Sequence, residues 1–174
     1  GWVEENLSKL KPIKELEMVF VLENSSETPF QVLKDFDILS LSKLELQIQF
    51  NSGESNYLVG IIADFIKSQK DLEELIFYQN DVSLGVEEIV LLKDAIKDHQ
   101  KLKKVLLSFN NCSRIHLGKV QPLTRSIAEL PSLTNVSIYL RNCANIPALF
   151  KETLQNQFAH LDPRNVKIDV KHEI

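Results

Sequence analysis

The chain has 174 residues, of which 44% are hydrophobic and 25% are charged, and its formal net charge at pH 7 is −4. This composition is typical of a folded domain and excludes a disordered chain. The acidic net charge, with no run of more than two Lys or Arg residues, argues against direct contact with nucleic acid. No apolar run approaches the roughly 18 residues that a membrane-spanning helix needs, so no membrane association is expected.

A short pattern, apolar-x-x-apolar-x-apolar, recurs along the chain. Its copies begin near residues 13, 41, 72, 102, 133 and 163, so successive copies are 28, 31, 30, 31 and 30 residues apart. The last copy begins at Pro163, where the first apolar anchor is lost. A spacing this constant predicts a repeated structural unit. Residues 1–12 precede the first copy and carry three apolar residues at helical spacing, which indicates either the helical tail of an earlier repeat or an N-terminal cap.

Each copy predicts a β-strand, because its fourth and sixth residues are apolar and successive side chains alternate between the two faces of a strand. In the first, second and fifth copies the alternation continues, through Phe20, Ile48 and Leu140 respectively. Asparagines follow these strands, and their side chains can bond backbone groups where the chain turns. They are Asn24, Asn51, Asn80, Asn110 and Asn142.

Helices are expected between the strands, because apolar residues recur there at intervals of three and four. The pattern predicts helices over residues 58–66, 89–96, 120–127 and 150–158, and residues 30–38 follow it less regularly. Pro122 and Pro147 are expected near helix starts, where the missing N–H of proline costs little.

A strand and a helix every 28–31 residues cannot bury an apolar face alone, whereas stacked units share one elongated core. This pattern resembles the ribonuclease-inhibitor-like leucine-rich repeat family over nearly all of residues 13–170. The resemblance implies an α/β fold, in which residues 13–174 form a curved solenoid of about six repeats. A parallel sheet would line its concave side and helices its convex side. The copies depart from the family pattern by using Ile, Val and Phe for Leu, and the family has many roles, so function does not follow from the fold.

The third, fifth and seventh positions of each copy should face the concave side. The residues at these positions are acidic in the first copies, basic in the last copies and apolar in the central ones. Exposed strand positions are usually polar, so this apolar centre indicates a partner site. The candidate binding residues are Ile76, Tyr78, Leu106, Tyr139, Arg141, Glu45, Gln47 and Lys167. We expect the leading contacts from Tyr78, Tyr139 and Arg141, since binding hot spots favour Tyr and Arg. Alternatively, a segment of the same chain covers this centre, or the seventh position turns inward.

The sequence contains no recognisable catalytic or cofactor-binding arrangement. Cys112 and Cys143 share the eleventh position of adjacent copies, which allows a disulfide, half of a metal site with His116, or two core cysteines. The core interpretation is favoured, because a zinc site needs four ligands and no second Cys/His pair is in register. Two cysteines do not form a secreted disulfide framework, so an intracellular, cytoplasmic setting is expected. No catalytic residue, metal, cofactor or small-molecule substrate is therefore predicted.

Three functions remain open at this point. The favoured hypothesis is a non-catalytic module that binds a protein partner on its concave face within a larger intracellular assembly. The second is a structural subunit that contacts its neighbours through helices and end repeats. The third is the regulatory part of an enzyme system of the GTPase-activating type, for which no matching residues are found.

Overall fold

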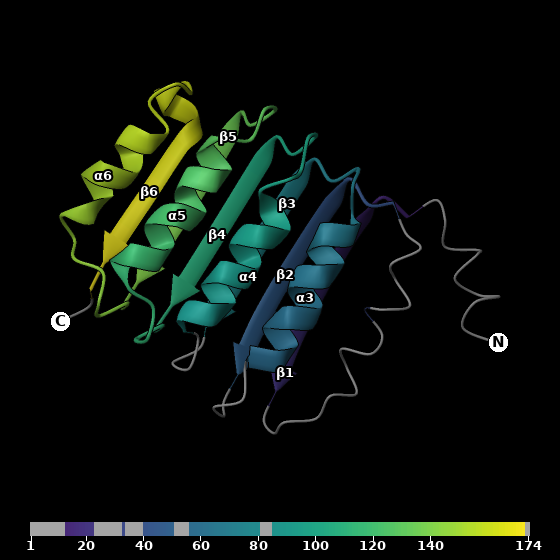
Figure 1. Cartoon of the computed structure of the whole chain (residues 1–174), viewed down its shortest axis with the longest axis horizontal. Helices are drawn as coiled ribbons and strands as arrows, with labels where there is room; N and C mark the ends of the chain where they lie inside the picture. Colours follow the sequence, from purple (N-terminus) through teal and green to yellow (C-terminus); the bar gives the residue numbers. More distant parts are fainter. Residues whose placement is uncertain (1–12, 23–32, 34–39, 51–55, 81–84, 173–174) are drawn as a thin grey trace.

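The computed structural model describes residues 13–22, 33, 40–50, 56–80 and 85–172 (Figure 1). Its strands are β1 (Glu15–Leu22), β2 (Lys43–Phe50), β3 (Glu74–Asn80), β4 (Lys104–Asn110), β5 (Asn135–Arg141) and β6 (Val166–Lys171). The helices in this part of the chain are α3 (Asn56–Ser68), α4 (Val86–Ile96), α5 (Leu117–Ala128) and α6 (Phe150–Gln157), with a 3₁₀ turn, η3, at Pro163–Asn165. None of these helices has both the length and the apolar character needed to cross a bilayer.

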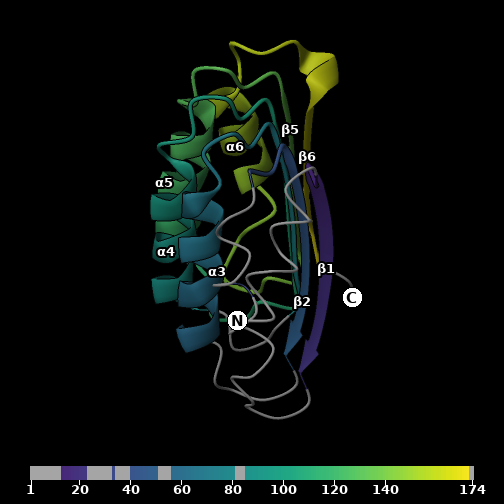
Figure 2. The same ribbon diagram turned by 90° about the vertical axis from the view of Figure 1, so that its right-hand side faces the viewer.

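The six strands form one parallel sheet in the order β1-β2-β3-β4-β5-β6, so each strand pairs with its neighbours in the sequence. The helices lie on one side of this sheet, and the other side, which we call the open face, carries no helix in the described part of the chain (Figure 2). The α/β fold expected from the sequence is therefore confirmed. Parallel strands need crossover connections, and α3, α4, α5 and α6 lie in four of those connections.

The core lies between the sheet and the helices. The fourth and sixth residues of the copies are almost fully buried in β2, β3, β4 and β5, as the pattern predicted: Leu44, Leu46, Leu75, Phe77, Val105, Leu107, Val136 and Ile138. In β1, the first strand of the described sheet, the corresponding Leu16 and Met18 are only partly buried. The helices contribute the apolar faces that the spacing predicted, for example Ile62 and Ile66 of α3.

Several expectations are corrected or fall outside the described residues. Helix α5 begins at Leu117, earlier than expected, so Pro122 lies inside it rather than near its start. Pro122 is exposed, which leaves solvent to hydrate the carbonyl that its missing N–H cannot bond. Asn165, the third residue of the last copy, is expected on the strand face but belongs to η3. The predicted segment 1–12 is not described, and of the expected helix 30–38 only Leu33 is described, a buried helical residue.

The chain leaves β4 and β5 through two asparagines in the left-handed conformation, Asn111 with φ 56° and Asn142 with φ 55°. Asparagine tolerates this conformation better than most residues. Asn142 Nδ2 donates to Asn111 Oδ1 at 3.3 Å, and Asn111 Nδ2 donates to Asn80 Oδ1 at 2.9 Å. The turn after β4 therefore uses Asn111 instead of the predicted Asn110, which is the last residue of the strand.

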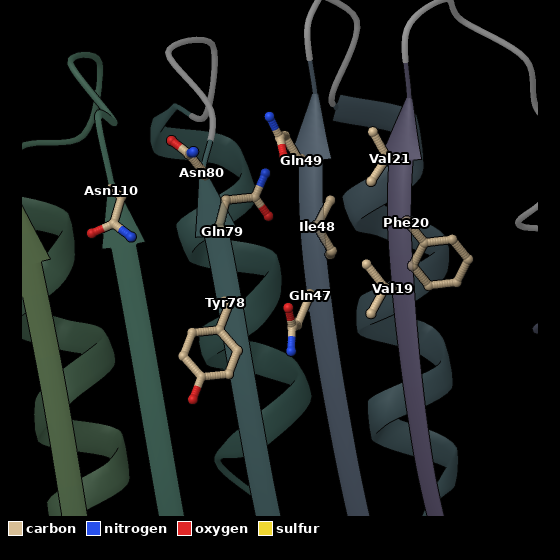
Figure 3. A pocket seen from close by; sticks show the side chains of 10 residues that line it. All are labelled: Val19, Phe20, Val21, Gln47, Ile48, Gln49, Tyr78, Gln79, Asn80 and Asn110. Atoms are coloured by element: carbon tan, nitrogen blue, oxygen red, sulfur yellow. The ribbon is translucent and has the colours of Figure 1, made fainter.

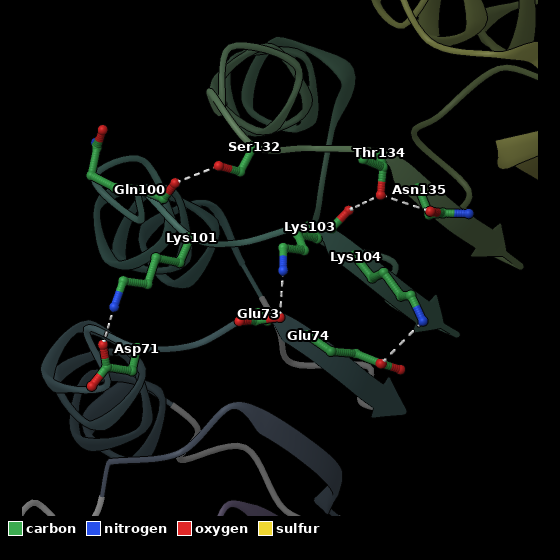
Figure 4. A network of polar contacts seen from close by, with 10 residues as sticks. All are labelled: Asp71, Glu73, Glu74, Gln100, Lys101, Lys103, Lys104, Ser132, Thr134 and Asn135. Carbon is green, nitrogen blue, oxygen red and sulfur yellow. Dashed lines mark hydrogen bonds and ion pairs between the residues drawn. The ribbon is translucent and has the colours of Figure 1, made fainter.

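At the opposite end of the sheet, ion pairs join equivalent positions of β3 and β4 and of the loops before them (Figure 4). Lys103 Nζ lies 2.7 Å from Glu73 Oε2, Lys104 Nζ lies 3.6 Å from Glu74 Oε2, and Lys101 pairs with Asp71. These side chains are largely exposed, so solvent screens each pair and its contribution to stability is minor. Their main effect is on register, since each opposite charge faces its partner only when the repeats are aligned.

Candidate functional site

The parallel register arranges the open face into rows that cross the strands at right angles. The fifth-position row runs from β1 to β6 through Glu17, Glu45, Ile76, Leu106, Ser137 and Lys167. The seventh-position row contains Val19, Gln47, Tyr78, Ser108, Tyr139 and Asp169. The ninth-position row contains Val21, Gln49, Asn80, Asn110, Arg141 and Lys171. All eight residues selected from the sequence therefore lie on one face, within three adjacent rows.

Two tyrosines form the centre of the open face. Tyr78 and Tyr139 lie on either side of Ser108 in the seventh-position row. Ser108 is only 6% exposed although it belongs to the open face. Burial raises the pKa of Tyr78, and the nearby Glu45 carboxylate and Tyr139 add to this shift. The two phenol groups are thus close enough to influence each other. We call Ile76, Tyr78, Leu106 and Tyr139 the central patch.

A basic corner adjoins the central patch at the β5–β6 end. The Arg141 guanidinium lies 5.3 Å from the centre of the Tyr139 ring, within the range of a cation–π contact. Arg141 also lies 3.3 Å from Asp169 Oδ2, and Lys171 Nζ lies 3.5 Å from Asp169 Oδ1. The Arg141 guanidinium therefore contacts both the Tyr139 ring and the Asp169 carboxylate. The role of Asp169 could not be seen in the sequence, because it depends on the pairing of β5 with β6.

Two shallow hollows mark the β1–β2 end of the open face. In the first, Val19, Gln47 and Tyr78 lie side by side on three neighbouring strands, and its volume is about 110 Å³ (Figure 3). Val19 and Val21 are 58% and 57% exposed, unusually high values for valines on a strand. The second hollow is lined by Glu15, Leu16, Glu17, Lys43 and Glu45. The alternation of Val19 and Val21 along β1 was the sequence signal that could have added these valines to the candidate site.

Gln79 is a buried polar residue that the repeat pattern did not predict. It occupies the eighth position of the third copy, within β3 and on the helix side of the sheet, between Ile48 of β2 and Phe109 of β4. Its side chain is 1% exposed, and neither its Nε2 nor its Oε1 has a hydrogen-bond partner among the described residues. Such a group costs about 1–3 kcal/mol of stability relative to a satisfied one.

The two cysteines are buried core residues. Cys112 and Cys143 are both 0% exposed and neither forms a disulfide. A hydrogen bond with Cys112 lowers the pKa of the Cys143 thiol, against the opposing effect of burial. Among the described residues, no group of three or more His, Cys, Asp or Glu side chains is placed to hold a metal ion. The open face presents two phenols, apolar side chains and charged groups.

Comparison of the sequence with models of known protein families gave no match, and a search of curated proteins gave no relative. Function is therefore inferred from the side chains of the open face.

Proposed function

We propose that the chain is a stretch of a ribonuclease-inhibitor-like leucine-rich repeat solenoid. The support is that residues 28 to 31 apart in the sequence occupy equivalent places on neighbouring strands. The matched turns at Asn111 and Asn142 add to this support, as does the placement of the helices on one side of the sheet. In such a solenoid the open face is the concave side.

We propose further that this chain is a non-catalytic module that binds a protein partner on its open face, within a larger assembly. The central patch carries the proposal. Two tyrosines and two aliphatic residues share a sheet surface where polar side chains are the usual occupants, and charged residues lie on both sides of them. An apolar and aromatic centre within a polar rim is the typical anatomy of a protein interface.

The test compares the double variant Tyr78→Ala/Tyr139→Ala with a matched control, Leu91→Ala/Leu149→Ala. Leu91 and Leu149 are exposed apolar residues outside the sheet: Leu91 lies in α4, and Leu149 directly precedes α6. The control therefore removes a similar apolar surface elsewhere on the protein. Each protein is used to capture and crosslink partners from its native source. We expect the tyrosine variant to lower capture at least about tenfold, equivalent to about 1.4 kcal/mol, and the control to have little effect.

Crosslinks in the wild-type complex should concentrate on β3, β4 and β5. Capture that is unchanged by the tyrosine substitutions, with crosslinks concentrated on α3 to α6, would reject the open face as the binding site and favour the structural-subunit function. Both variants should keep the thermal unfolding midpoint of the wild type within a few degrees, since the substituted side chains lie outside the core.

A further inference from the structure

The two ends of the open face carry opposite charge. Near β1 and β2, the described charged residues that line one hollow are three carboxylates, Glu15, Glu17 and Glu45, and one ammonium group, that of Lys43. No ion pair joins any of these four groups to another residue in the described ranges. On the next two strands, Glu74 of β3 and Lys104 of β4 form an ion pair and neutralise each other. An excess of negative charge therefore remains at this end of the face.

The β5–β6 end has the opposite excess. Among the described residues of β5 and β6 on this face, three cations, Arg141, Lys167 and Lys171, are opposed by one carboxylate, that of Asp169. Asp169 forms ion pairs with both Arg141 and Lys171. Lys167 is exposed and makes no ion pair with a described residue. The central patch separates the two ends, so the order across the strands is acidic, apolar and basic.

Geometry determines the size of an occupant that would use all three parts. Six strands spaced by about 4.8 Å place β1 and β6 about 24 Å apart. An extended polypeptide advances about 3.3 Å per residue, so about seven residues cross the sheet. A segment that matches the charges must bring basic residues to Glu15, Glu17 and Glu45 and acidic residues to Lys167. A reversed segment would place like charges together, which costs affinity and slows association.

We infer that the open face receives a segment of another polypeptide with fixed polarity: a basic end over β1 and β2, an apolar middle on Tyr78 and Tyr139, and an acidic end over β6. This inference rests on the proposed function, because it names the chemistry of the partner at the same face. The central patch provides most of the affinity, and the charged ends choose the direction of the segment.

The experiment selects binders for the full chain from a displayed library of random 16-residue peptides. We expect the selected peptides to carry Lys and Arg in one half, Asp and Glu in the other, and apolar residues between them. Their charge halves should occur in one order only. One selected peptide is then synthesised in the forward and the reversed order, and its affinity is measured at low and high salt. The forward peptide should bind at least about tenfold more tightly at low salt, and the difference should shrink at high salt.

Three variants test the assignment. Glu17→Lys/Glu45→Lys should lose the preference for Lys and Arg, and Tyr78→Ala/Tyr139→Ala should lose binding at least about tenfold. The control Glu87→Lys/Glu129→Lys makes the same charge change at exposed positions of the helix layer and should select the same peptides as the wild type.

The outcomes distinguish failure of the charge-order inference from failure of the proposed function. Peptides that depend on the tyrosines but show no charge order would overturn this inference and leave the proposed function standing. No enrichment, or enrichment indifferent to the tyrosines, would overturn both. Self-association of the chain that the tyrosine variant abolishes, measured by analytical ultracentrifugation, would identify a second copy as the occupant and overturn the inference.

Discussion

Leu106 and Leu107 are consecutive residues of β4 that lie on opposite faces of the sheet. Leu107 is fully buried against the helices, whereas Leu106 is part of the central patch on the open face and is only partly buried. The alternation of a strand thus assigns one leucine to the core and the adjacent one to the candidate site.

This pair makes a direct test of the register. Leu107→Ala should lower the free energy of unfolding by about 2–5 kcal/mol, because it removes buried methyl groups and leaves a cavity. Leu106→Ala should lower it by less than about 1 kcal/mol, as for a surface substitution. Urea denaturation of both variants measures the difference. Equal losses would mean that β4 is not oriented as described.

Gln79 and Gln69 are both buried glutamines, but among the described residues only the amide of Gln69 has hydrogen-bond partners. Gln69 Oε1 accepts from the backbone N–H of Leu41 at 3.2 Å, and its Nε2 donates to Ser68 Oγ at 3.0 Å. We expect Gln79→Met to raise the free energy of unfolding by about 1 kcal/mol, because it removes an unsatisfied amide from an apolar row. Gln69→Met should lower it by about 1–3 kcal/mol. Destabilisation by Gln79→Met, measured in the same urea titrations, would show that the amide has a partner.

His99 should make stability depend on pH. It is 3% exposed, and its pKa is lowered from the ordinary value of 6.5, chiefly by burial and next by the charge of Lys70. The nearby backbone carbonyls of Ile66 and Ala95 and the Asp98 carboxylate oppose this shift only in part. The unfolded chain therefore binds the proton more readily than the folded one. The part of the unfolding free energy that depends on neutral His99 is fully present above pH 6.5. It decreases as the pH falls below 6.5, by at most about 1.4 kcal/mol per pH unit.

His99→Gln should remove this contribution, so its unfolding free energy should change less between pH 8 and pH 5.5 than that of the wild type. His160→Gln is the control, since His160 is exposed. The assignment to His99 would be wrong if the control, and not His99→Gln, flattened the pH dependence.

The pKa of Tyr78 reports on the geometry of the candidate site. Glu45→Gln should lower the pKa of Tyr78, because the negative charge of Glu45 disfavours the phenolate and glutamine keeps the shape without the charge. The three tyrosines of the chain can be resolved by carbon-13 NMR after labelling of their ring carbons. Glu17→Gln, one strand farther away, should have a smaller effect. Equal shifts in both variants would contradict the placement of Glu45 beside Tyr78.

Much of the fold could be predicted because the repeat is encoded locally. The buried pairs such as Leu75 and Phe77 follow from alternation within one strand, and the helix faces follow from spacing within one turn. Details that depend on backbone geometry were harder to predict. Two neighbouring asparagines follow β4, and only the backbone conformation decides that Asn111, not Asn110, makes the turn. Pro122 was misplaced because the α5 start carries no strong capping residue, with His116 at the cap position.

The sequence by itself determined which residues share the open face, because the period of two along each strand and the period of about 30 between strands are properties of the chain. Tertiary structure alone decided how those residues act on one another. Pairing of neighbouring strands places Tyr78 and Tyr139 on either side of Ser108, brings Asp169 to Arg141, and leaves Gln79 without a partner among the described residues. These neighbours are about 30 positions apart in the sequence, and the strength of their interactions depends on distance and burial, which local pattern does not contain.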